Sequence, residues 1–220
     1  MINKLEDNLG KTIMIVVFFL FMLLDAALFA AMFTGTQGDH WWLILISRFF
    51  SLIFMTMVVF FTILRLPPKD NADGIEPRIS SIIGTFAMMS LIVLPTGEVS
   101  GGLRLFSTVL IIVGTILSIY CLRWLGKSFS IMATARNLVT SGPYSIVRHP
   151  LYFAEAIMII GLIIANWSIA AVIVGTIQFA FQFRRMFNEE RVLRRTFPEY
   201  EEYAKRTPFI IPFSKRTAPA

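Results

Sequence analysis

Long runs of apolar residues, separated by short polar segments, make up most of the first half of the chain. The runs cover residues 13–33, 43–64, 79–94 and 103–122. A helix needs about 20 apolar residues to cross the hydrocarbon layer of a membrane, which is about 30 Å thick. The pattern therefore predicts four membrane-spanning helices in this region, of which the third is the shortest.

A fifth apolar run covers residues 151–183 and contains no lysine or arginine. It is too long for one spanning helix and about right for two short ones. Asn166, Trp167 and Ser168 interrupt it with a polar turn, which predicts a short helical hairpin. With the first four runs, this makes the chain an all-α integral membrane protein with about six transmembrane helices.

The distribution of basic residues supports this count. With six spans and the N-terminus inside, 18 of the 20 Lys and Arg residues fall on the inner side, and only Arg48 and Arg104 fall outside. Cytoplasmic segments of membrane proteins carry such an excess. We therefore expect both termini, and any site in the last third of the chain, on the cytoplasmic side, in the inner (plasma) membrane if the protein is bacterial.

Composition narrows the classes of function. A chain of 220 residues that is 56% hydrophobic exposes more apolar surface than one small water-soluble core can cover. The net charge of +6 is explained by attraction to anionic lipids at the inner membrane face, so we expect membrane lipids and no nucleic acid as partners. Cys121 is the only cysteine, and we expect no metal site. The first apolar run, residues 13–33, is too long for a signal-peptide core and should be retained in the mature protein. The sequence leaves the oligomeric state open.

The segment from Thr140 to Tyr152 places polar groups directly before an apolar run. A turn is followed by Pro150, which suits the first position of a helix. Arg148 and His149 then lie at a helix N-terminus, where free N–H groups and the helix dipole favour an anion. This predicts a site for a negatively charged ligand. The alternative is an interfacial anchor, with Arg148 reaching lipid headgroups and Tyr152 in the aromatic belt.

The segment 183–197 is predicted to continue the sixth span as a cytosolic amphipathic helix that Pro198 ends. Its apolar stripe comprises Phe183, Met186, Leu193 and Phe197, and its wetter face comprises Arg184, Asn188, Arg191 and Arg195. Glu190 falls on the apolar stripe and should turn inward. A buried carboxylate needs a cationic partner, either an arginine or the ammonium group of a ligand. Glu189 should pair with Arg185 one helical turn away.

Four further polar residues and one apolar segment have expected structural or site roles. Asp25 lies midway along the first span and is expected to have a paired, structural role rather than a catalytic one. Glu155 follows Tyr152 by three residues and can line the same cavity. Gln178 and Gln182 share a helix face and are expected to hydrogen-bond across the hairpin. The apolar stretch PFIIP, at 208–212, is expected to fold back over the site.

These elements resemble the membrane methyltransferases related to isoprenylcysteine carboxyl methyltransferase and to the phospholipid N-methyltransferases. The shared pattern reads LGKSFS at 125–130, LVTSGPYSIVRHPLY at 138–152 and RMFNEE at 185–190, in this order. It separates N-terminal transmembrane helices, residues 1–122, from a cofactor-binding region, residues 123–220, within one continuous membrane domain. The resemblance implies S-adenosylmethionine as the methyl donor.

The resemblance also implies roles for the matching positions. Backbone contacts to the cofactor would come from Leu138, Val139 and Gly142. Its pocket would be lined by Tyr144, Arg148, His149, Pro150 and Tyr152. Glu189 or Glu190 would meet its ammonium group. The catalytic candidates are Arg148, Arg185, which would orient an anionic acceptor, and Glu155.

The chain departs from the family pattern at two points. Arg136 stands where many relatives have a histidine, which alters possible cofactor contacts because arginine accepts no hydrogen bond. The glycine common soon after the HPxY tyrosine is absent, and Glu155 lies there instead. We therefore expect the substrate to differ from prenylcysteine.

The leading hypothesis is methyl transfer from S-adenosylmethionine to a lipophilic acceptor from the bilayer. The acceptor types are an isoprenylcysteine-like carboxylate, a phospholipid amine or a small thiol. Two alternatives stay open: an NADPH-dependent membrane reductase of the sterol reductase type, and a non-catalytic lipid-binding membrane protein. From the apolar stripe, Glu190 should matter more for cofactor binding than Glu189.

Overall fold

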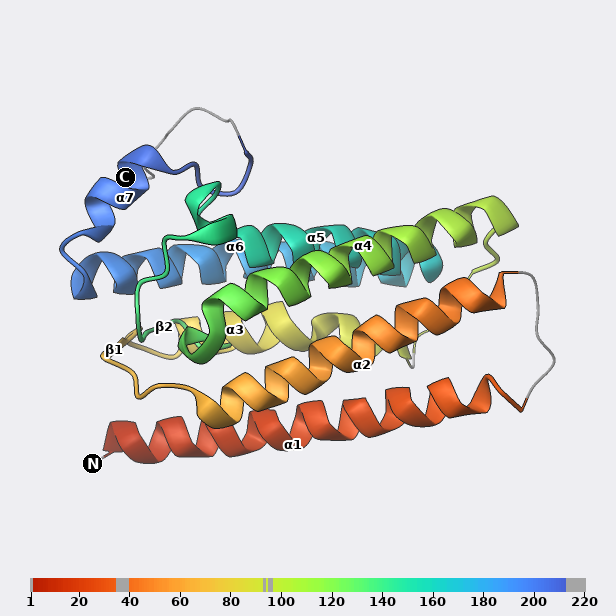
Figure 1. Ribbon diagram of the computed structural model, residues 1–220, viewed down its shortest axis with the longest axis horizontal. Helices are drawn as coiled ribbons and strands as arrows, with labels where there is room; N and C mark the ends of the chain where they lie inside the picture. Colours follow the sequence, from red (N-terminus) through yellow and green to blue (C-terminus); the bar gives the residue numbers. More distant parts are fainter. Residues whose placement is uncertain (1, 35–39, 93, 95–96, 213–220) are drawn as a thin grey trace.

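The computed structural model describes residues 2–34, 40–92, 94 and 97–212 and consists almost entirely of helices. Six helical segments run alternately in opposite directions along one axis (Figure 1). They are α1 (Ile2–Ala31), α2 (Trp41–Leu64), α3 (Glu76–Phe86) with its 3₁₀ continuation η1 (Ala87–Ile92), α4 (Gly101–Leu125), α5 (Pro150–Ala165) and α6 (Ile169–Thr196). The all-α class is confirmed.

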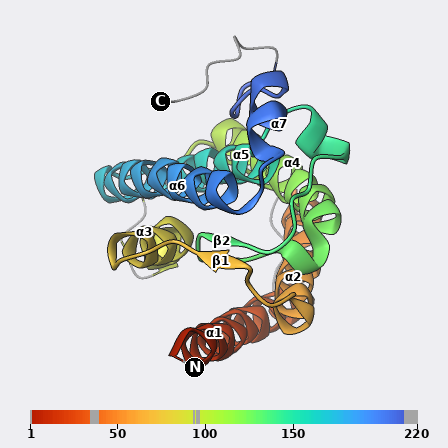
Figure 2. The same ribbon diagram turned by 90° about the vertical axis from the view of Figure 1, so that its left-hand side faces the viewer.

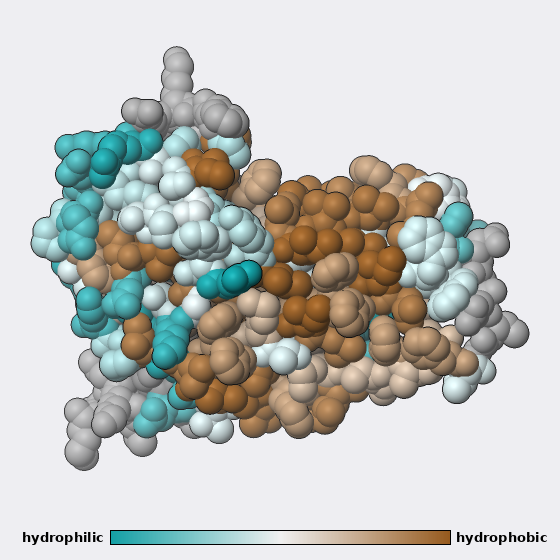
Figure 3. Space-filling model, in the orientation of Figure 1, coloured by the Kyte–Doolittle hydropathy of each residue, from teal (hydrophilic) through white to brown (hydrophobic). Residues whose placement is uncertain are grey.

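Among the described residues, three stretches are long and apolar enough to cross a membrane by themselves: Gly10–Ala31, Trp41–Leu64 and Gly101–Ser128. The second and third contain the predicted spans 43–64 and 103–122, and the first ends two residues before the end of the predicted span 13–33. On the face shown in Figure 3, hydrophobic side chains cover the middle of the molecule, and more hydrophilic surface lies at its two ends. The exposed apolar side chains of these helices therefore suit a lipid surrounding, as in an integral membrane protein.

Helices α3 and α5 have only 11 and 16 residues, and the 28-residue α6 is apolar only in its first part, so the count of six spans stays a prediction. The third predicted span starts three residues after the N-terminus of α3 and tightens into η1 at Ala87, while its residue 93 lies outside the described part of the chain. The hairpin is confirmed, because α5 ends at Ala165 and α6 begins at Ile169. Ser168 caps α6 by accepting a hydrogen bond from the Ala171 N–H at 3.1 Å.

The start of α1, the short helix α7 (Tyr200–Arg206) and a pair of two-residue strands lie at the same end of the molecule, called here the site end (Figures 1 and 2). The strands β1 (Asp70–Asn71) and β2 (Thr134–Ala135) pair antiparallel. They join the chain after α2 to the chain after α4. Two residues carry no readable periodicity, so the sequence did not predict them.

Helices α4 and α5 approach each other closely through small residues. A Cβ atom built on Gly114 would lie 2.6 Å from the Met158 backbone nitrogen and 2.9 Å from the Ala154 carbonyl oxygen. Gly161 is similarly enclosed, by Ser107 and Ile111 of α4. Small residues commonly form helix contacts in membranes, where lipid removes the hydrophobic drive for association and close packing must replace it.

Polar pairs connect further helices within the apolar region. Asp25 of α1 and Arg48 of α2 form an ion pair of 2.7 Å, which confirms the expected pairing of Asp25. Gln182 donates to Glu155 across the hairpin at 2.9 Å, as predicted. Gln178 instead donates to the carbonyl of Gly84 in α3 at 2.5 Å, so this glutamine connects α6 to a different helix.

The predicted wet face of α6 is wrong for one residue. Asn188 is buried, and its amide donates to Glu76 at 3.1 Å and to Ser80 at 3.2 Å, both in α3. Helix α3 covers this part of α6, which periodicity alone cannot reveal. Conversely, Phe183 of the predicted inward stripe is 45% exposed, because it lies on the outer surface of the hairpin.

We predict that Gly114→Ala destabilises the protein by about 1 to 3 kcal/mol, because the new methyl group overlaps the α5 backbone. Gly102→Ala, in the same helix α4, is the matched control, since a Cβ atom on Gly102 would lie within 4 Å of no neighbouring atom. Alanine favours a helix over glycine, so the control should be neutral or stabilising. Thermal unfolding of both variants in detergent tests this, and equal unfolding temperatures would contradict the close α4–α5 contact.

Candidate active site

A pocket opens at the site end between the loop after α4, the start of α5 and the outer part of α6. Nine of the twelve residues predicted for the site line it: Leu138, Val139, Tyr144, Arg148, His149, Tyr152, Glu155, Arg185 and Glu189. Gly142, Pro150 and Glu190 are not among its lining residues. The three sequence motifs, which lie between residues 125 and 190 of the chain, therefore meet at one cavity.

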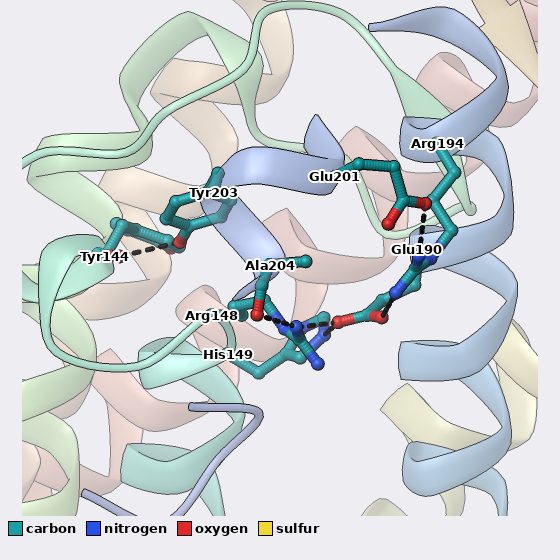
Figure 4. Close-up of polar contacts among 8 residues, drawn as sticks. All are labelled: Tyr144, Arg148, His149, Glu190, Arg194, Glu201, Tyr203 and Ala204. Carbon is teal, nitrogen blue, oxygen red and sulfur yellow. Dashed lines mark hydrogen bonds and ion pairs between the residues drawn. The ribbon is translucent and has the colours of Figure 1, made fainter. Parts of the chain in front are cut away.

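The carboxylate of Glu190 joins α6 to the start of α5. Its Oε1 lies 2.7 Å from Nε of Arg148 and 3.3 Å from Nε2 of His149 (Figure 4). Its Oε2 lies 3.3 Å from Nη2 of Arg194. The inward orientation of Glu190 is confirmed, since its side chain is 3% exposed. Its cationic partners are the chain's own arginines.

The surroundings of Glu190 keep it ionised. Burial by itself raises the pKa of a carboxyl group. The hydrogen bond with His149 and the charges of Arg148 and Arg194 outweigh burial, so the pKa of Glu190 lies below its ordinary value. A charged carboxylate surrounded by these groups is satisfied without any ligand.

Arg148 also fixes the C-terminal part of the chain. Its Nη1 donates to the carbonyl of Ala204 in α7 at 2.8 Å (Figure 4). The backbone N–H groups of Arg148 and His149 donate to the carbonyls of Pro208 and Phe209. Residues 207–212, called here the tail strap, thus fold back over the start of α5, as expected. The interfacial-anchor alternative is wrong, because the Arg148 side chain is 1% exposed and faces Glu190 rather than lipid headgroups.

Glu189 occupies a different environment from its neighbour. The Tyr152 hydroxyl donates to Glu189 Oε1, and Nε of Arg185 lies 3.3 Å from the same oxygen, which confirms the predicted pair. Arg185 further donates to the Thr85 hydroxyl at 3.1 Å and to the Ser130 carbonyl at 3.0 Å. The Arg185 guanidinium is therefore held by several protein groups. Of the two adjacent glutamates, Glu189 lines the pocket and Glu190 does not.

Glu155 lies deeper, one helical turn beyond Tyr152 on α5. Its Oε2 accepts the 2.9 Å hydrogen bond from Gln182, and this is its one hydrogen bond among the described residues. Because a neutral amide holds it rather than a close ion pair, its carboxylate is the pocket acid with the most freedom to accept a proton. Its depth places it between the polar pocket and the apolar part of the hairpin.

Several buried hydroxyl groups of the pocket wall have no hydrogen-bond partner among the described residues. They are Oγ of Ser130, Oγ1 of Thr134 and Oη of Tyr144. Burial raises the pKa of Tyr144 far above its ordinary value, so its phenol stays a proton donor. Buried polar groups normally find partners, so these atoms fit a polar ligand. Together with the Glu189 carboxylate, they suit the amino acid and ribose groups of S-adenosylmethionine.

The enclosed space of the pocket is about 90 Å³, which is room for a few water molecules. A nucleoside-sized ligand therefore needs a wall to move outward. Tyr200 and Tyr203 of α7 form part of the pocket wall, and the Tyr203 hydroxyl donates to the Tyr144 carbonyl at 2.6 Å. Helix α7 and the tail strap are the segments that cover the site.

Some pocket residues were not predicted. Ser128 and Ser130 belong to the LGKSFS motif, which signalled the region without assigning them a role. Thr134 lies on β2, and no sequence signal marks it.

Gly142 was expected to contact the cofactor but is not among the residues that line the pocket. Its φ of +61° is left-handed, and a Cβ atom there would overlap the Trp124 ring, so the turn requires glycine at this position.

Comparison with known proteins finds similarity in the part of the chain that forms the pocket. Residues 103–200 match the family model described as phospholipid methyltransferase. The chain is 45% identical over 77 residues to the cobalt-zinc-cadmium resistance protein CzcN of Cupriavidus metallidurans. This match covers 34% of this chain and 36% of that protein. It is 34% identical over 116 residues to the protein-S-isoprenylcysteine O-methyltransferase B of Arabidopsis thaliana, covering 49% of this chain and 58% of that protein.

These matches confirm the resemblance seen in the motifs. Residues 103–200, which begin in α4 and end at the start of α7, are similar to the phospholipid methyltransferases, and part of the chain is similar to an isoprenylcysteine methyltransferase. The match spans only about a third of the length of CzcN and just over half of the plant enzyme.

We predict that Glu190→Gln lowers the free energy of unfolding by about 3 to 5 kcal/mol, because it leaves Arg148 buried without its carboxylate. Since the pKa of Glu190 lies below 4.5 when folded, its contribution is fully present above that pH. It disappears as the pH falls through the folded pKa. Acidification should therefore destabilise the wild type more than the variant.

The matched control is Glu202→Gln, because Glu202 is 75% exposed and its pair with Arg206 is 3.5 Å long. Denaturant unfolding between about pH 3 and pH 7 measures both effects. If Glu190→Gln were as stable as the control, the ion cluster would not be holding α5 to α6.

Proposed function

We propose that the protein transfers a methyl group from S-adenosylmethionine to a lipophilic acceptor that enters from the bilayer. The observation that carries this proposal is the convergence of nine of the predicted site residues on one pocket at the end of the apolar helices. The match of residues 103–200 to phospholipid methyltransferases supports the reaction type. We place the site end on the cytoplasmic side, where most of the basic residues of the predicted topology lie.

The pocket contains suitable groups for each part of the cofactor. Glu189 would hold its ammonium group by a charge-assisted hydrogen bond. The unpartnered hydroxyls of Tyr144 and Ser130 would donate to its carboxylate or ribose oxygens. The backbone of Leu138 and Val139 would hold its base. When bound, S-adenosylmethionine supplies an electrophilic methyl group on a sulfonium ion.

Catalysis would consist mainly of alignment and exclusion of water. Tyr152, held by Glu189 and packed 5.0 Å from the Arg185 guanidinium, forms a rigid side of the pocket. A rigid wall keeps the donor and the acceptor atom in line, which by itself accelerates a bimolecular transfer. Closure of α7 and the tail strap would keep water from the reacting atoms.

Glu155 would serve as the general base for an acceptor that carries a proton. It lies where the pocket meets the apolar hairpin, the direction from which a lipid acceptor would arrive. An ammonium acceptor must lose a proton before it attacks, whereas a carboxylate or a thiolate needs no base. The role of Glu155 therefore separates these acceptor classes.

Calorimetry with the purified protein tests the cofactor. We expect binding of S-adenosylmethionine and of its demethylated product, and no binding of NADPH. Glu189→Gln should raise the dissociation constant about tenfold, because a charge-assisted hydrogen bond is worth about 1.5 kcal/mol or more. The apolar stripe alone assigned the larger effect to Glu190, whereas the pocket geometry favours Glu189.

Glu202→Gln, which removes a distant exposed carboxylate, should leave cofactor binding unchanged. Binding of NADPH instead of S-adenosylmethionine would indicate a reductase. Binding of neither cofactor would indicate a lipid-binding protein.

Transfer of labelled methyl groups tests the role of Glu155. We expect Glu155→Gln to lower turnover of a phospholipid amine about 100-fold or more, since a general base contributes about 10² to 10⁴. Turnover of a prenylcysteine carboxylate should change only a few-fold, and so should turnover of a small thiol above its pKa of about 8.5, where it is already a thiolate. Glu98→Gln, at an exposed glutamate before α4, is the control. An equal loss with all three acceptors would mean that Glu155 acts on the fold of the pocket and not as a base.

A further inference from the structure

The two ends of the active-site pocket differ in the side chains that line them. Arg185, Glu189 and Leu193 of α6 all line the pocket, and they follow one another at intervals of four residues, or about 6 Å along the helix. Glu155, Arg185 and Glu189 make the deep end of the pocket charged. Leu193 marks its outer end, where no side chain takes part in the proposed reaction itself.

Apolar and aromatic side chains form this outer end. Leu138 and Leu193 line it together with Tyr200 and Tyr203 of α7. The same four side chains pack in one hydrophobic cluster with Ala135 of β2, which is fully buried. Tyr200 and Tyr203 are 1% and 7% exposed, and their rings meet edge to face with centres 5.7 Å apart. The outer end therefore gives a planar apolar ligand group a place away from water.

Asn137 adds a polar side chain to this apolar end. It lies on the loop between Ala135 and Leu138, which both belong to the cluster, and it lines the pocket. Asn137 is exposed, and its side-chain amide makes no hydrogen bond to another described residue. An amide presents donors and an acceptor side by side. It can therefore pair with a ligand edge that carries one acceptor next to one donor.

An adenine base combines these two properties. Its faces are aromatic and stack on aromatic side chains. Its edge carries an amino donor beside a ring-nitrogen acceptor, the combination to which asparagine forms two hydrogen bonds when proteins read adenine in DNA. The amino acid arm of S-adenosylmethionine is charged instead, and it matches the carboxylate of Glu189 at the other side of the pocket.

We propose that Asn137 recognises the adenine base of S-adenosylmethionine, with the base packed against Leu138, Leu193 and the two tyrosines of α7. This assignment rests on the proposed function and deepens it: Glu189 holds the amino acid arm, and Asn137 reads the base. The enclosed space of the pocket is about 90 Å³. Because α7 forms the wall of the outer end, it is the segment that the base displaces on entry.

Calorimetry of the full chain in detergent with two ligands tests the position of the base. S-adenosylhomocysteine has the base and the amino acid arm, whereas 5′-methylthioadenosine has the base without that arm. Asn137→Ala should raise the dissociation constants of both ligands about tenfold, because two hydrogen bonds to the base are lost. Glu189→Gln should weaken only S-adenosylhomocysteine, since methylthioadenosine has no ammonium group for Glu189 to hold. Binding is measured without an acceptor, so methyl transfer plays no part in the result.

The matched control is Thr140→Ala, at an exposed residue of the same loop that does not line the pocket. It should change neither affinity by more than twofold. Thermal unfolding of Asn137→Ala should match the wild type, because Asn137 is exposed.

Two results would overturn the role of Asn137 while leaving the cofactor assignment intact. One is unchanged binding of methylthioadenosine by Asn137→Ala. The other is a wild type that binds S-adenosylhomocysteine but not methylthioadenosine, which would mean that the base contributes little to binding. A wild type that binds neither ligand would overturn the proposed function itself, and the base site with it.

Discussion

The ion pair between Arg148 and Glu190 is the interaction on which the candidate site depends. Both side chains are almost fully removed from water, and burying two charges costs several kcal/mol for each ion. Further hydrogen bonds to the remaining polar atoms stabilise such a pair. Here Ala204, His149 and Arg194 provide them, while Nη2 of Arg148 has no hydrogen-bond partner among the described residues. The consequence is a fixed geometry that joins α5, α6 and α7.

This fixed geometry matters because the surrounding helices expose apolar side chains, as membrane helices do. Between membrane helices the hydrophobic effect gives no drive for association, so close packing and polar contacts determine which helices meet. The chain uses both: Gly114 and Gly161 bring α4 against α5, and Gln178 and Gln182 connect α6 to α3 and α5. The pocket forms where these contacts end, at the boundary with water.

The two adjacent glutamates of α6 have different surroundings and different roles. Successive residues point about 100° apart on a helix, so Glu189 and Glu190 face different neighbours. Glu190 is surrounded by cations of the protein and stabilises the fold. Glu189 contacts Tyr152 and Arg185 and lines the pocket, where a ligand can reach it. A motif that reads as one pair thus contains one structural and one ligand-facing carboxylate.

Four features could be predicted from the sequence alone: the apolar helices, the hairpin turn at Asn166–Ser168, the helix start at Pro150 and the inward face of Glu190. Each follows from local rules: span length, backbone limits of proline, or helical periodicity. What covers each face depends on the packing of distant segments. This packing buries Asn188 under α3, pairs β1 with β2 and gives Glu190 the partner Arg148. Periodicity shows which side of a helix turns inward, but the partner on that side comes from residues far away in the chain.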